Sequence, residues 1–261
     1  MVFREMGNSA SPAVLLIHGM LSDADDSLSY GKYLSDEYYV LCPTLDGHGN
    51  DGSTLVSGGD EAEKIVSFLE EKGIERLSLL QGCSMGAEVA LAVLSECGRR
   101  GIYVEKAFFD GGPFFDFSPL FRKFMELVFT SLIARVGKSS SPEELTSHPF
   151  VKFVGGKKAD AFMPMMSKVV RKKIHYTKSS VRGMVETCYH CILPKLDEDV
   201  QRRCMFFFSL EEPARKSRKR LRQAYPKARY MSIKGYPHCG LMINRPQKYA
   251  DVLRSFMSLS V

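Results

Sequence analysis

Two kinds of hydrophobic pattern alternate along residues 1–112. Continuous apolar runs at 13–17 and 77–80 are typical of strands that are buried on both faces of a sheet. Between them, residues 61–72 place apolar side chains at helical spacing, and Gly73 follows as a helix-ending residue. Further strands are expected at 38–42 and 104–109, and a further helix at 25–34. This alternation predicts a mostly parallel sheet flanked by helices.

The pattern changes after Pro113. From 114 to about 194 the spacing is helical, with helices expected at 120–136, from Ser141, at 159–173 and at 180–191. Segment 120–136 is apolar almost all round, so we expect it to be covered on more than one side. Strands then return at 205–208 and 228–233, with helices at 214–224 and from Pro246. We therefore expect a core formed by 1–112 and 195–261, and a helical insertion at 113–194.

The most informative motif is Gly82-Cys83-Ser84-Met85-Gly86. A buried strand precedes it and an apolar helical face follows at 87–97, which is the strand–turn–helix context of a nucleophile elbow. Such a turn is too tight for side chains two residues either side of the serine, and both positions are glycine. The motif predicts Ser84 as a nucleophile and the Met85 amide as a donor to a developing oxyanion.

Together with other motifs, the elbow gives the chain a clear family resemblance. It resembles the α/β-hydrolase superfamily, in its cap-bearing serine esterase and lipase-like subset. The resemblance implies the α/β-hydrolase fold, with a helical cap between strands six and seven and the chain order nucleophile, acid, histidine. Little sequence precedes Ala13, so the first one or two strands are expected to be missing or very short. The motifs that carry the resemblance are His18-Gly19, Asp46-Gly47-His48-Gly49, 82–86 and Gly235-Tyr236-Pro237-His238-Cys239-Gly240.

The resemblance also implies the partners of Ser84. His238, in a Gly- and Pro-rich loop after the last strand, takes the place of the base that a serine hydroxyl needs. The acid belongs in the loop after strand 205–208, where Glu212 aligns best. Glu211 and Asp110 remain the alternatives for this role.

Other groups near the expected site have supporting roles. The backbone amide of Met20 is expected to be the second oxyanion donor, and His18 to order that loop. His48 is expected to brace a turn, with direct participation in the chemistry as the alternative. The histidines of the insertion, which are His148, His175 and His190, are expected to be structural, with contact between one of them and the substrate as the alternative.

These residues predict a serine hydrolase that cleaves carboxylic esters of small to medium apolar acyl groups through an acyl-enzyme. One alternative keeps the triad for a thioester, a C–C bond or a lyase step like that of the menaquinone-pathway synthase. Another is a weakly catalytic ligand-binding receptor. No metal or organic cofactor is expected. The candidate substrate-binding residues are aromatic and thioether side chains of the insertion: Phe114, Phe115, Phe121, Met125, Met163 and Met166.

Composition indicates in which compartment the protein is expected and what kind of partner it has. The chain has 261 residues, a net charge of +6 and seven cysteines, an odd number that fits a reducing compartment better than a disulfide framework. No apolar stretch is long enough to span a bilayer, and the N-terminus lacks an apolar signal region. We therefore expect a cytoplasmic protein without a membrane partner, acting on a small molecule.

Two local features are given ordinary structural interpretations. The basic runs 168–173 and 215–220 are expected to be solvated helix faces rather than a nucleic-acid site, because no aromatic residues or nucleic-acid motif accompany them. Cys188-Tyr189-His190-Cys191 has no second pair at metal-ligand spacing, so packing cysteines are favoured over zinc.

Overall fold

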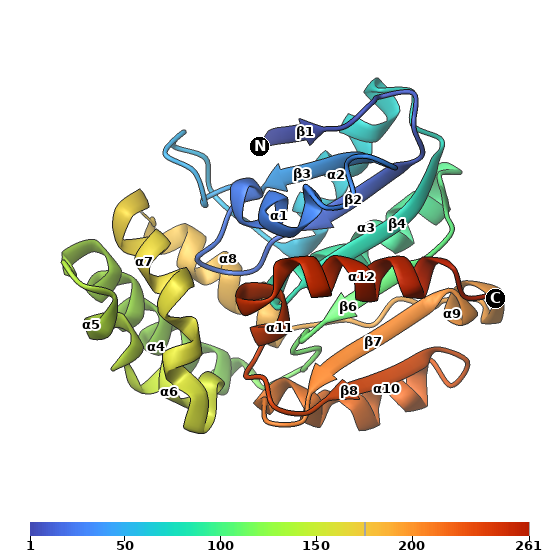
Figure 1. The fold of residues 1–261 in the computed structure, drawn as a ribbon. Helices are drawn as coiled ribbons and strands as arrows, with labels where there is room; N and C mark the ends of the chain where they lie inside the picture. The colour runs from blue at the N-terminus through green and yellow to red at the C-terminus, as the bar shows by residue number, and fades with distance from the viewer. Residues whose placement is uncertain (175, 261) are drawn as a thin grey trace.

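The structure is a computed structural model that describes residues 1–174 and 176–260, with the backbone alone at 157–159. An eight-stranded sheet forms its centre, in the order β1-β3-β2-β4-β6-β7-β8, with β5 paired to β4 (Figure 1). The strands are β1 (Val2–Met6), β2 (Ala13–Ile17), β3 (Tyr39–Thr44), β4 (Arg76–Cys83), β5 (Tyr103–Val104), β6 (Ala107–Asp110), β7 (Cys204–Ser209) and β8 (Arg229–Ile233).

The sheet is parallel except at one edge, which confirms the predicted mostly parallel architecture. β1 alone pairs antiparallel, with β3, and it is the short strand that precedes Ala13. The expected strand at 104–109 is two strands, because Glu105 and Lys106 interrupt it between β5 and β6. The parallel strands β2, β4, β6, β7 and β8 direct their carboxyl ends to the same edge of the sheet.

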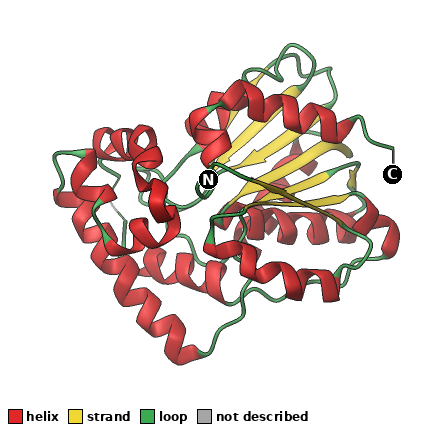
Figure 2. Cartoon of the chain, turned by 60° about the horizontal axis from the view of Figure 1, so that its bottom comes forward, coloured by secondary structure: helices red, strands yellow, loops and turns green. Residues whose placement is uncertain are grey.

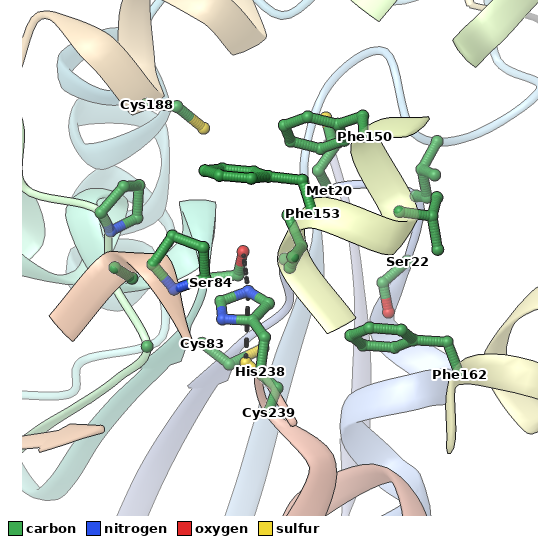
Figure 3. A pocket seen from close by; sticks show the side chains of 18 of the residues that line it. Met20, Ser22, Cys83, Ser84, Phe150, Phe153, Phe162, Cys188, His238 and Cys239 are labelled. Atoms are coloured by element: carbon green, nitrogen blue, oxygen red, sulfur yellow. Dashed lines mark hydrogen bonds between the residues drawn. The ribbon is translucent and has the colours of Figure 1, made fainter. Parts of the chain in front are cut away.

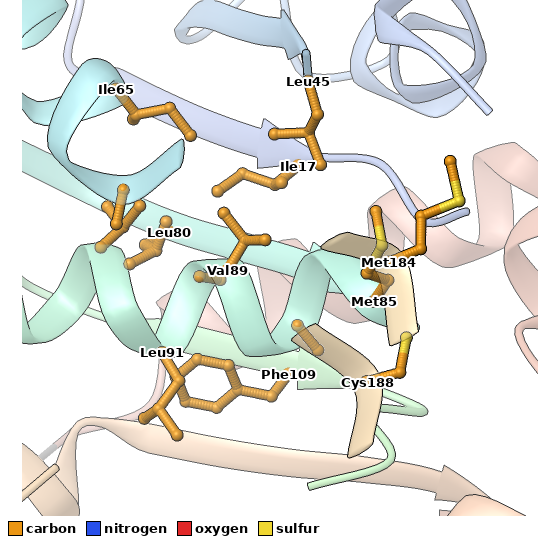
Figure 4. Packing of buried hydrophobic residues seen from close by; sticks show 14 of the residues in the cluster. Ile17, Leu45, Ile65, Leu80, Met85, Val89, Leu91, Phe109, Met184 and Cys188 are labelled. Atoms are coloured by element: carbon orange, nitrogen blue, oxygen red, sulfur yellow. The ribbon is translucent and has the colours of Figure 1, made fainter. Parts of the chain in front are cut away.

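Both faces of the sheet are covered by helices because successive side chains of a strand point to opposite faces. Leu15 and Ile17 of β2 join one apolar cluster, and Val14 and Leu16 join another. Figure 4 shows the first cluster between β2, β4 and the helix that follows Ser84. The first face carries α2 (Gly58–Glu71), α3 (Met85–Arg100) and α10 (Arg218–Ala224), and the second carries α1 (Ala24–Gly31) and α12 (Pro246–Met257). Three short helices lie between these elements in the chain: α9 (Glu198–Arg202), η2 (Pro213–Ser217) and α11 (Gly240–Asn244).

The chain between β6 and β7 is helical in the part that the structure describes. Figure 2 shows these helices as a group beside the sheet, at one end of its strands. They differ from expectation in two places: α6 is an additional helix, and segment 159–173 is divided between η1 and α7. The division of the chain into two domains stays a prediction. The helices are α4 (Pro119–Lys138), α5 (Pro142–Thr146), α6 (Pro149–Gly155), η1 (Gly156–Phe162), α7 (Met163–Lys172) and α8 (Lys178–Tyr189).

Helix α4 is less covered than its apolar sequence predicts. One side, with Met125, Phe129, Leu132 and Val136, is buried. The opposite side, which includes Leu120, Phe124 and Leu127, is exposed. The expectation that α4 is covered on more than one side is therefore wrong: α8, α5 and α7 contact this helix, and the large apolar side chains opposite its buried side stay exposed.

Every described helix is too short or too polar to cross a lipid bilayer.

Candidate active site

Ser84 lies in a strained turn between β4 and α3. Its φ is 55° and its ψ is −126°, a conformation that non-glycine residues rarely adopt. A Cβ at Gly82 would collide with the backbone of Gly86, and a Cβ at Gly86 would collide with the carbonyls of Ile17 and His18. The turn is held further by the Ser84 amide, which donates to the Asp110 carbonyl at 2.7 Å.

His238 brings its imidazole to Ser84 from 154 positions along the chain. Its Nε2 lies 2.8 Å from the Ser84 Oγ, a distance suited to proton transfer. The loop that carries His238 is closed by the Gly240 amide, which donates to the Pro237 carbonyl at 2.9 Å. Figure 3 shows the imidazole pointing at the serine hydroxyl, with Cys83 and Cys239 beside the pair.

Glu212 contacts the other nitrogen of the same imidazole. Its Oε2 lies 2.5 Å from His238 Nδ1, and its Oε1 accepts from the Ser209 amide at 2.6 Å. The carboxylate is fully buried, and a hydrogen bond from the Ser209 hydroxyl to the Tyr236 carbonyl ties the two loops together. With the carboxylate on Nδ1, that nitrogen carries the proton and Nε2 is free to accept one from Ser84.

The surroundings of His238 favour its protonated form. Burial by itself lowers the pKa of the imidazole, but the hydrogen bond and charge of Glu212, together with the charge of Asp110, raise it by more. The net result is a pKa above the ordinary value of 6.5. His238 is therefore a stronger base than a free imidazole, as activation of a hydroxyl requires.

Of the two alternative acids, neither contacts the imidazole through a described hydrogen bond. Asp110 is buried at the end of β6, and burial together with the charge of Glu212 raises its pKa to about 7. Its Oδ2 has no hydrogen-bond partner among the described residues. Glu211 is exposed, and its amide donates to the Ser209 hydroxyl at 3.1 Å.

The two expected oxyanion donors are close to Ser84: Met85 directly follows it, and Gly19, the neighbour of Met20, packs against the Ser84 side chain. The Met85 amide is the first of α3, so it has no acceptor within the helix. Met20 lines the same cavity as Ser84. Among the described residues, no backbone or side-chain acceptor is bonded to the Met20 amide.

Beside this loop, His18 and His48 are buried as neutral rings. His18 Nδ1 lies 2.7 Å from the Gly19 carbonyl, and its Nε2 accepts from the Leu45 amide at 3.0 Å. Burial lowers the pKa of His18 to about 4. His48 Nδ1 lies 3.1 Å from the Asp46 carbonyl, and burial together with the charge of His18 lowers its pKa to about 3. Both rings hold loops together, and neither lines the cavity at Ser84.

The remaining histidines of the insertion lie away from the cavity where they are described. His148 Nδ1 accepts from the Phe150 amide at 3.2 Å at the start of α6. His190 pairs with Asp116 at 3.0 Å on the surface. His175 lies outside the described residues.

A thiol also lies near His238, but it is held protonated. The Cys239 Sγ is 3.7 Å from His238 Nε2 and 4.0 Å from the Asp110 carbonyl. A hydrogen bond with Cys83 and burial raise the pKa of Cys239 well above its ordinary value. Because the thiolate is the nucleophilic form of cysteine, a protonated Cys239 is a poor nucleophile although it lies next to the imidazole.

A cavity of about 790 Å³ opens at Ser84 and His238. Its walls are mostly apolar and come from α4, α6, η1 and α7, as Figure 3 shows for Phe150, Phe153 and Phe162. Asp26 and Lys168, joined at 2.7 Å, form a polar part of the lining.

Four of the six predicted substrate-binding side chains line this cavity: Phe115, Phe121, Met125 and Met166. Phe114 and Met163 do not, and for these two the prediction is wrong. Phe114 has a φ of 38°, which turns its ring into the core against Phe109 and Phe206. Met163 begins α7, and the helix directs Met165 and Met166 to the cavity instead.

Several lining residues were not predicted. Phe129 and Leu132 follow Met125 on the buried face of α4, at positions i+4 and i+7. That spacing was a usable signal, because residues four and seven apart share a helix face. Phe150 and Phe153 come from α6, which the sequence pattern did not predict as a helix.

Parts of both basic runs form ion pairs or hydrogen bonds with other residues of the protein. Lys168 and Lys172 pair with Asp26, and Lys172 also pairs with Asp23 at 2.6 Å, joining α7 to the start of α1. Arg220 of α10 is half-buried and donates to the Phe114 and Cys191 carbonyls at 2.7 and 2.9 Å. For these residues the expectation of a solvated helix face is wrong.

The cysteine motif is buried. Cys188 and Cys191 carry free thiols, and Cys188 lines the cavity. Over the described residues, no group of three or more His, Cys, Asp or Glu side chains is arranged to hold a metal ion.

Comparison with known proteins identifies the architecture. No model of a known protein family matches the chain, and no curated protein matches its sequence. Solved structures do match it. A Desulfitobacterium hafniense protein described as belonging to the alpha/beta hydrolase family superposes with a TM-score of 0.76 at 21% identity, covering 98% of this chain and 100% of that one. The chain has the α/β-hydrolase fold.

Other proteins with the α/β-hydrolase fold match over similar lengths. A thermophilic esterase from Thermogutta terrifontis gives a TM-score of 0.74 at 15% identity, covering 98% of this chain and 92% of the esterase. MenH from S. aureus gives 0.75 at 15% identity, covering 98% and 97%. At these identities the likeness establishes the fold, and the chemistry has to be argued from the site.

Proposed function

We propose that the protein is a serine hydrolase that cleaves carboxylic esters with apolar acyl groups of small to medium size. The observation that carries this proposal is the continuous hydrogen-bonded chain from Ser84 Oγ through His238 to Glu212, at 2.8 and 2.5 Å. It opens into a largely apolar cavity of about 790 Å³. The esterases among the proteins of the same fold add support.

In the proposed mechanism, Ser84 attacks the ester carbonyl while His238 Nε2 takes its proton. Glu212 keeps the proton of His238 on Nδ1 and stabilises the imidazolium that forms. The amides of Met20 and Met85 donate to the oxyanion, each contributing about 3 kcal/mol to transition-state stabilisation. His238 then protonates the leaving alcohol, and a water molecule activated by the same imidazole hydrolyses the acyl-enzyme.

The site supports catalysis better than ligand binding alone. A receptor has no need for a strained serine, and the φ of 55° at Ser84 is retained beside a base whose pKa is raised. The apolar walls favour an apolar acyl group over a charged one, because they offer a buried charge few partners.

A series of p-nitrophenyl esters with acyl chains of increasing length tests the proposal. We expect turnover by the wild type, with a preference within the series, and loss of at least about 10³-fold in kcat for Ser84→Ala. Turnover of acyl thioesters but not of oxygen esters would support the same triad acting on another bond. Ester turnover that persists in Ser84→Ala would contradict the proposal.

A further inference from the structure

Large apolar side chains gather on the outer surface of α4 and α6. On α4, Leu120, Phe124 and Leu127 follow one another at i, i+4 and i+7, and their exposed fractions are 81%, 57% and 67%. Phe153 of α6 is 63% exposed, and Phe121 is also exposed. Single exposed apolar residues are ordinary, but a cluster of this size on neighbouring helices is typical of a contact surface. We call these five residues the α4–α6 patch.

The patch is continuous with the cavity at Ser84. Phe121, Phe124 and Phe153 belong to both, because their side chains are solvent-exposed and also line the cavity, which places them at its opening. Farther inside, Phe129 lines the same cavity and is almost completely buried. An apolar path therefore runs from the outer surface of α4 and α6 to the serine. Figure 3 shows Phe150 and Phe153 of α6 in the cavity, close to Ser84.

Unpaired positive charges accompany the patch. Lys123 lies between the apolar residues of α4, and Lys152 precedes Phe153 on α6. Lys216 lines the cavity from η2. All three are exposed, and none forms an ion pair with a described residue. The only acidic residue in the sequence of α4 is Glu126, against Arg122, Lys123, Arg135 and Lys138, so this helix carries a net positive charge that favours an anionic partner.

We propose that the α4–α6 patch docks on a lipid surface with anionic headgroups, and that the ester reaches Ser84 from that surface. Exposed Leu and Phe side chains flanked by lysines are suited to the boundary between headgroups and acyl chains. A lipid surface explains why the cavity opens within the patch, since an acyl chain can pass directly from one apolar environment to another. A second copy of the chain seated there would close the opening. The part concerning the ester rests on the proposed function.

The docking step is tested without reference to turnover. The sequence contains no tryptophan, so Leu127→Trp places the protein's single tryptophan in the patch, where it can be excited selectively over the tyrosines at the red edge of the absorption band. With vesicles of phosphatidylcholine and phosphatidylglycerol, we expect its emission to shift to the blue and to be quenched by brominated acyl chains. Val56→Trp, in an exposed loop before α2, is the matched control and is expected to change little. Binding is expected to weaken in pure phosphatidylcholine and at high salt.

A second variant tests whether the patch itself binds. Leu120→Ser combined with Leu127→Ser removes two exposed side chains that do not line the cavity. We expect vesicle cosedimentation to fall at least about tenfold, because binding scales with the apolar area inserted. Three results would each overturn the docking proposal: no shift for Leu127→Trp, equal shifts for both tryptophan variants, or unchanged cosedimentation of the double variant. A wild-type dimer that the double variant dissociates would identify a second copy as the occupant and overturn it as well.

The supply of substrate is tested by comparing two esters. We expect the double variant to lose at least about tenfold in the hydrolysis of a long-chain umbelliferyl ester embedded in anionic vesicles, and to stay within about twofold of the wild type on p-nitrophenyl butyrate dissolved in water. Equal losses on both esters would overturn the supply step. If the wild type hydrolyses neither ester, the proposed function fails, while the tryptophan measurement still decides whether the patch docks.

Discussion

The strand ends that carry Ser84, Glu212 and His238 differ sharply from the helices that cover them. At the strand ends, the three side chains are fixed by hydrogen bonds to one another and to the backbone. Around the cavity, the lining of α4, α6 and α7 is mostly apolar and depends on side-chain packing. Hydrogen bonds impose distance and direction, whereas apolar packing imposes mainly volume.

Because of this difference, bond cleavage and the choice of acyl group are expected to depend on different regions of one site. The proposed bond cleavage depends on atoms placed to within a few tenths of an ångström at the sheet edge, so single polar substitutions there are expected to be severe. The choice of acyl group depends on the shape of an apolar cavity, so substitutions there are expected to be graded. The predictions below test whether the two regions can be altered independently.

The largest effect is expected for Glu212→Gln. Without the carboxylate, Nδ1 of His238 no longer has a fixed proton, and we expect kcat to fall about 10³- to 10⁴-fold with little change in KM. The hydrogen bond and charge of Glu212 raise the pKa of His238, so their loss lowers it. Activity requires neutral imidazole and is lost as the pH falls through this pKa. The acidic limb of the pH–rate profile is therefore expected to move to lower pH. A kcat within tenfold of the wild type would exclude Glu212 as the acid.

Asp110→Asn is the matched test at the neighbouring strand end. Because Asp110 touches Ser84 through its backbone carbonyl and not through its carboxyl group, we expect kcat to fall less than about tenfold. Its charge contributes to the raised pKa of His238, so the acidic limb is expected to move slightly to lower pH. A loss as large as that of Glu212→Gln would make Asp110 part of the triad.

In the cavity wall, Met165→Ala is expected to change selectivity while leaving the chemistry intact. Met165 lines the cavity, so its truncation is expected to alter kcat/KM for the longest ester of a series about tenfold and to leave the acetyl ester unchanged. Met163→Ala, two residues earlier in α7 and outside the lining, is the control and is expected to alter neither. Equal losses on every chain length would show that the wall also positions the catalytic groups.

The smallest effect is expected where α7 meets α1. Lys172 pairs with Asp23 and Asp26 at 2.6 and 3.0 Å, but all three side chains are partly exposed. Lys172→Gln is therefore expected to lower the free energy of unfolding by less than about 1 kcal/mol. Burial raises the pKa of Asp26, but Lys168 and Lys172 lower it by more, so this stabilisation exists above pH 3.8 and disappears as the pH falls through the lowered pKa. Denaturant titrations from pH 7 downwards measure it: the difference between wild type and Lys172→Gln is expected to shrink once the pH falls below 3.8, and a difference that grows towards acid pH would contradict the assignment.

The fold was predictable because its signals are local and strong. The apolar runs of β2 and β4 identify buried strands, and Gly82 and Gly86 identify the turn between β4 and α3. The position of His238 followed from a family resemblance rather than from periodicity. Most differences between the predicted and the observed elements are small, such as the division of the predicted strand 104–109 around Glu105 and Lys106.

The details that were missed depend on contacts between distant segments. Asp110 ends β6 and Glu212 lies in the loop that follows the neighbouring β7, and only the arrangement of these loops brings one carboxylate to Nδ1 of His238. The ring of Phe114 points into the core because Phe114 itself has a positive φ. Arg220 looked like part of a solvated run, but it binds carbonyls at both ends of the helical insertion. None of these contacts has a signature in local sequence spacing.

Reaction with a fluorophosphonate, followed by intact-mass measurement and peptide mapping, tests the central claim most directly. The reagent phosphonylates a serine that a neighbouring base has activated. The account predicts one adduct per chain, on Ser84, with labelling abolished in Ser84→Ala and strongly slowed in Glu212→Gln. An adduct on another residue, or an unlabelled Ser84 in a protein that still cleaves esters, would contradict it.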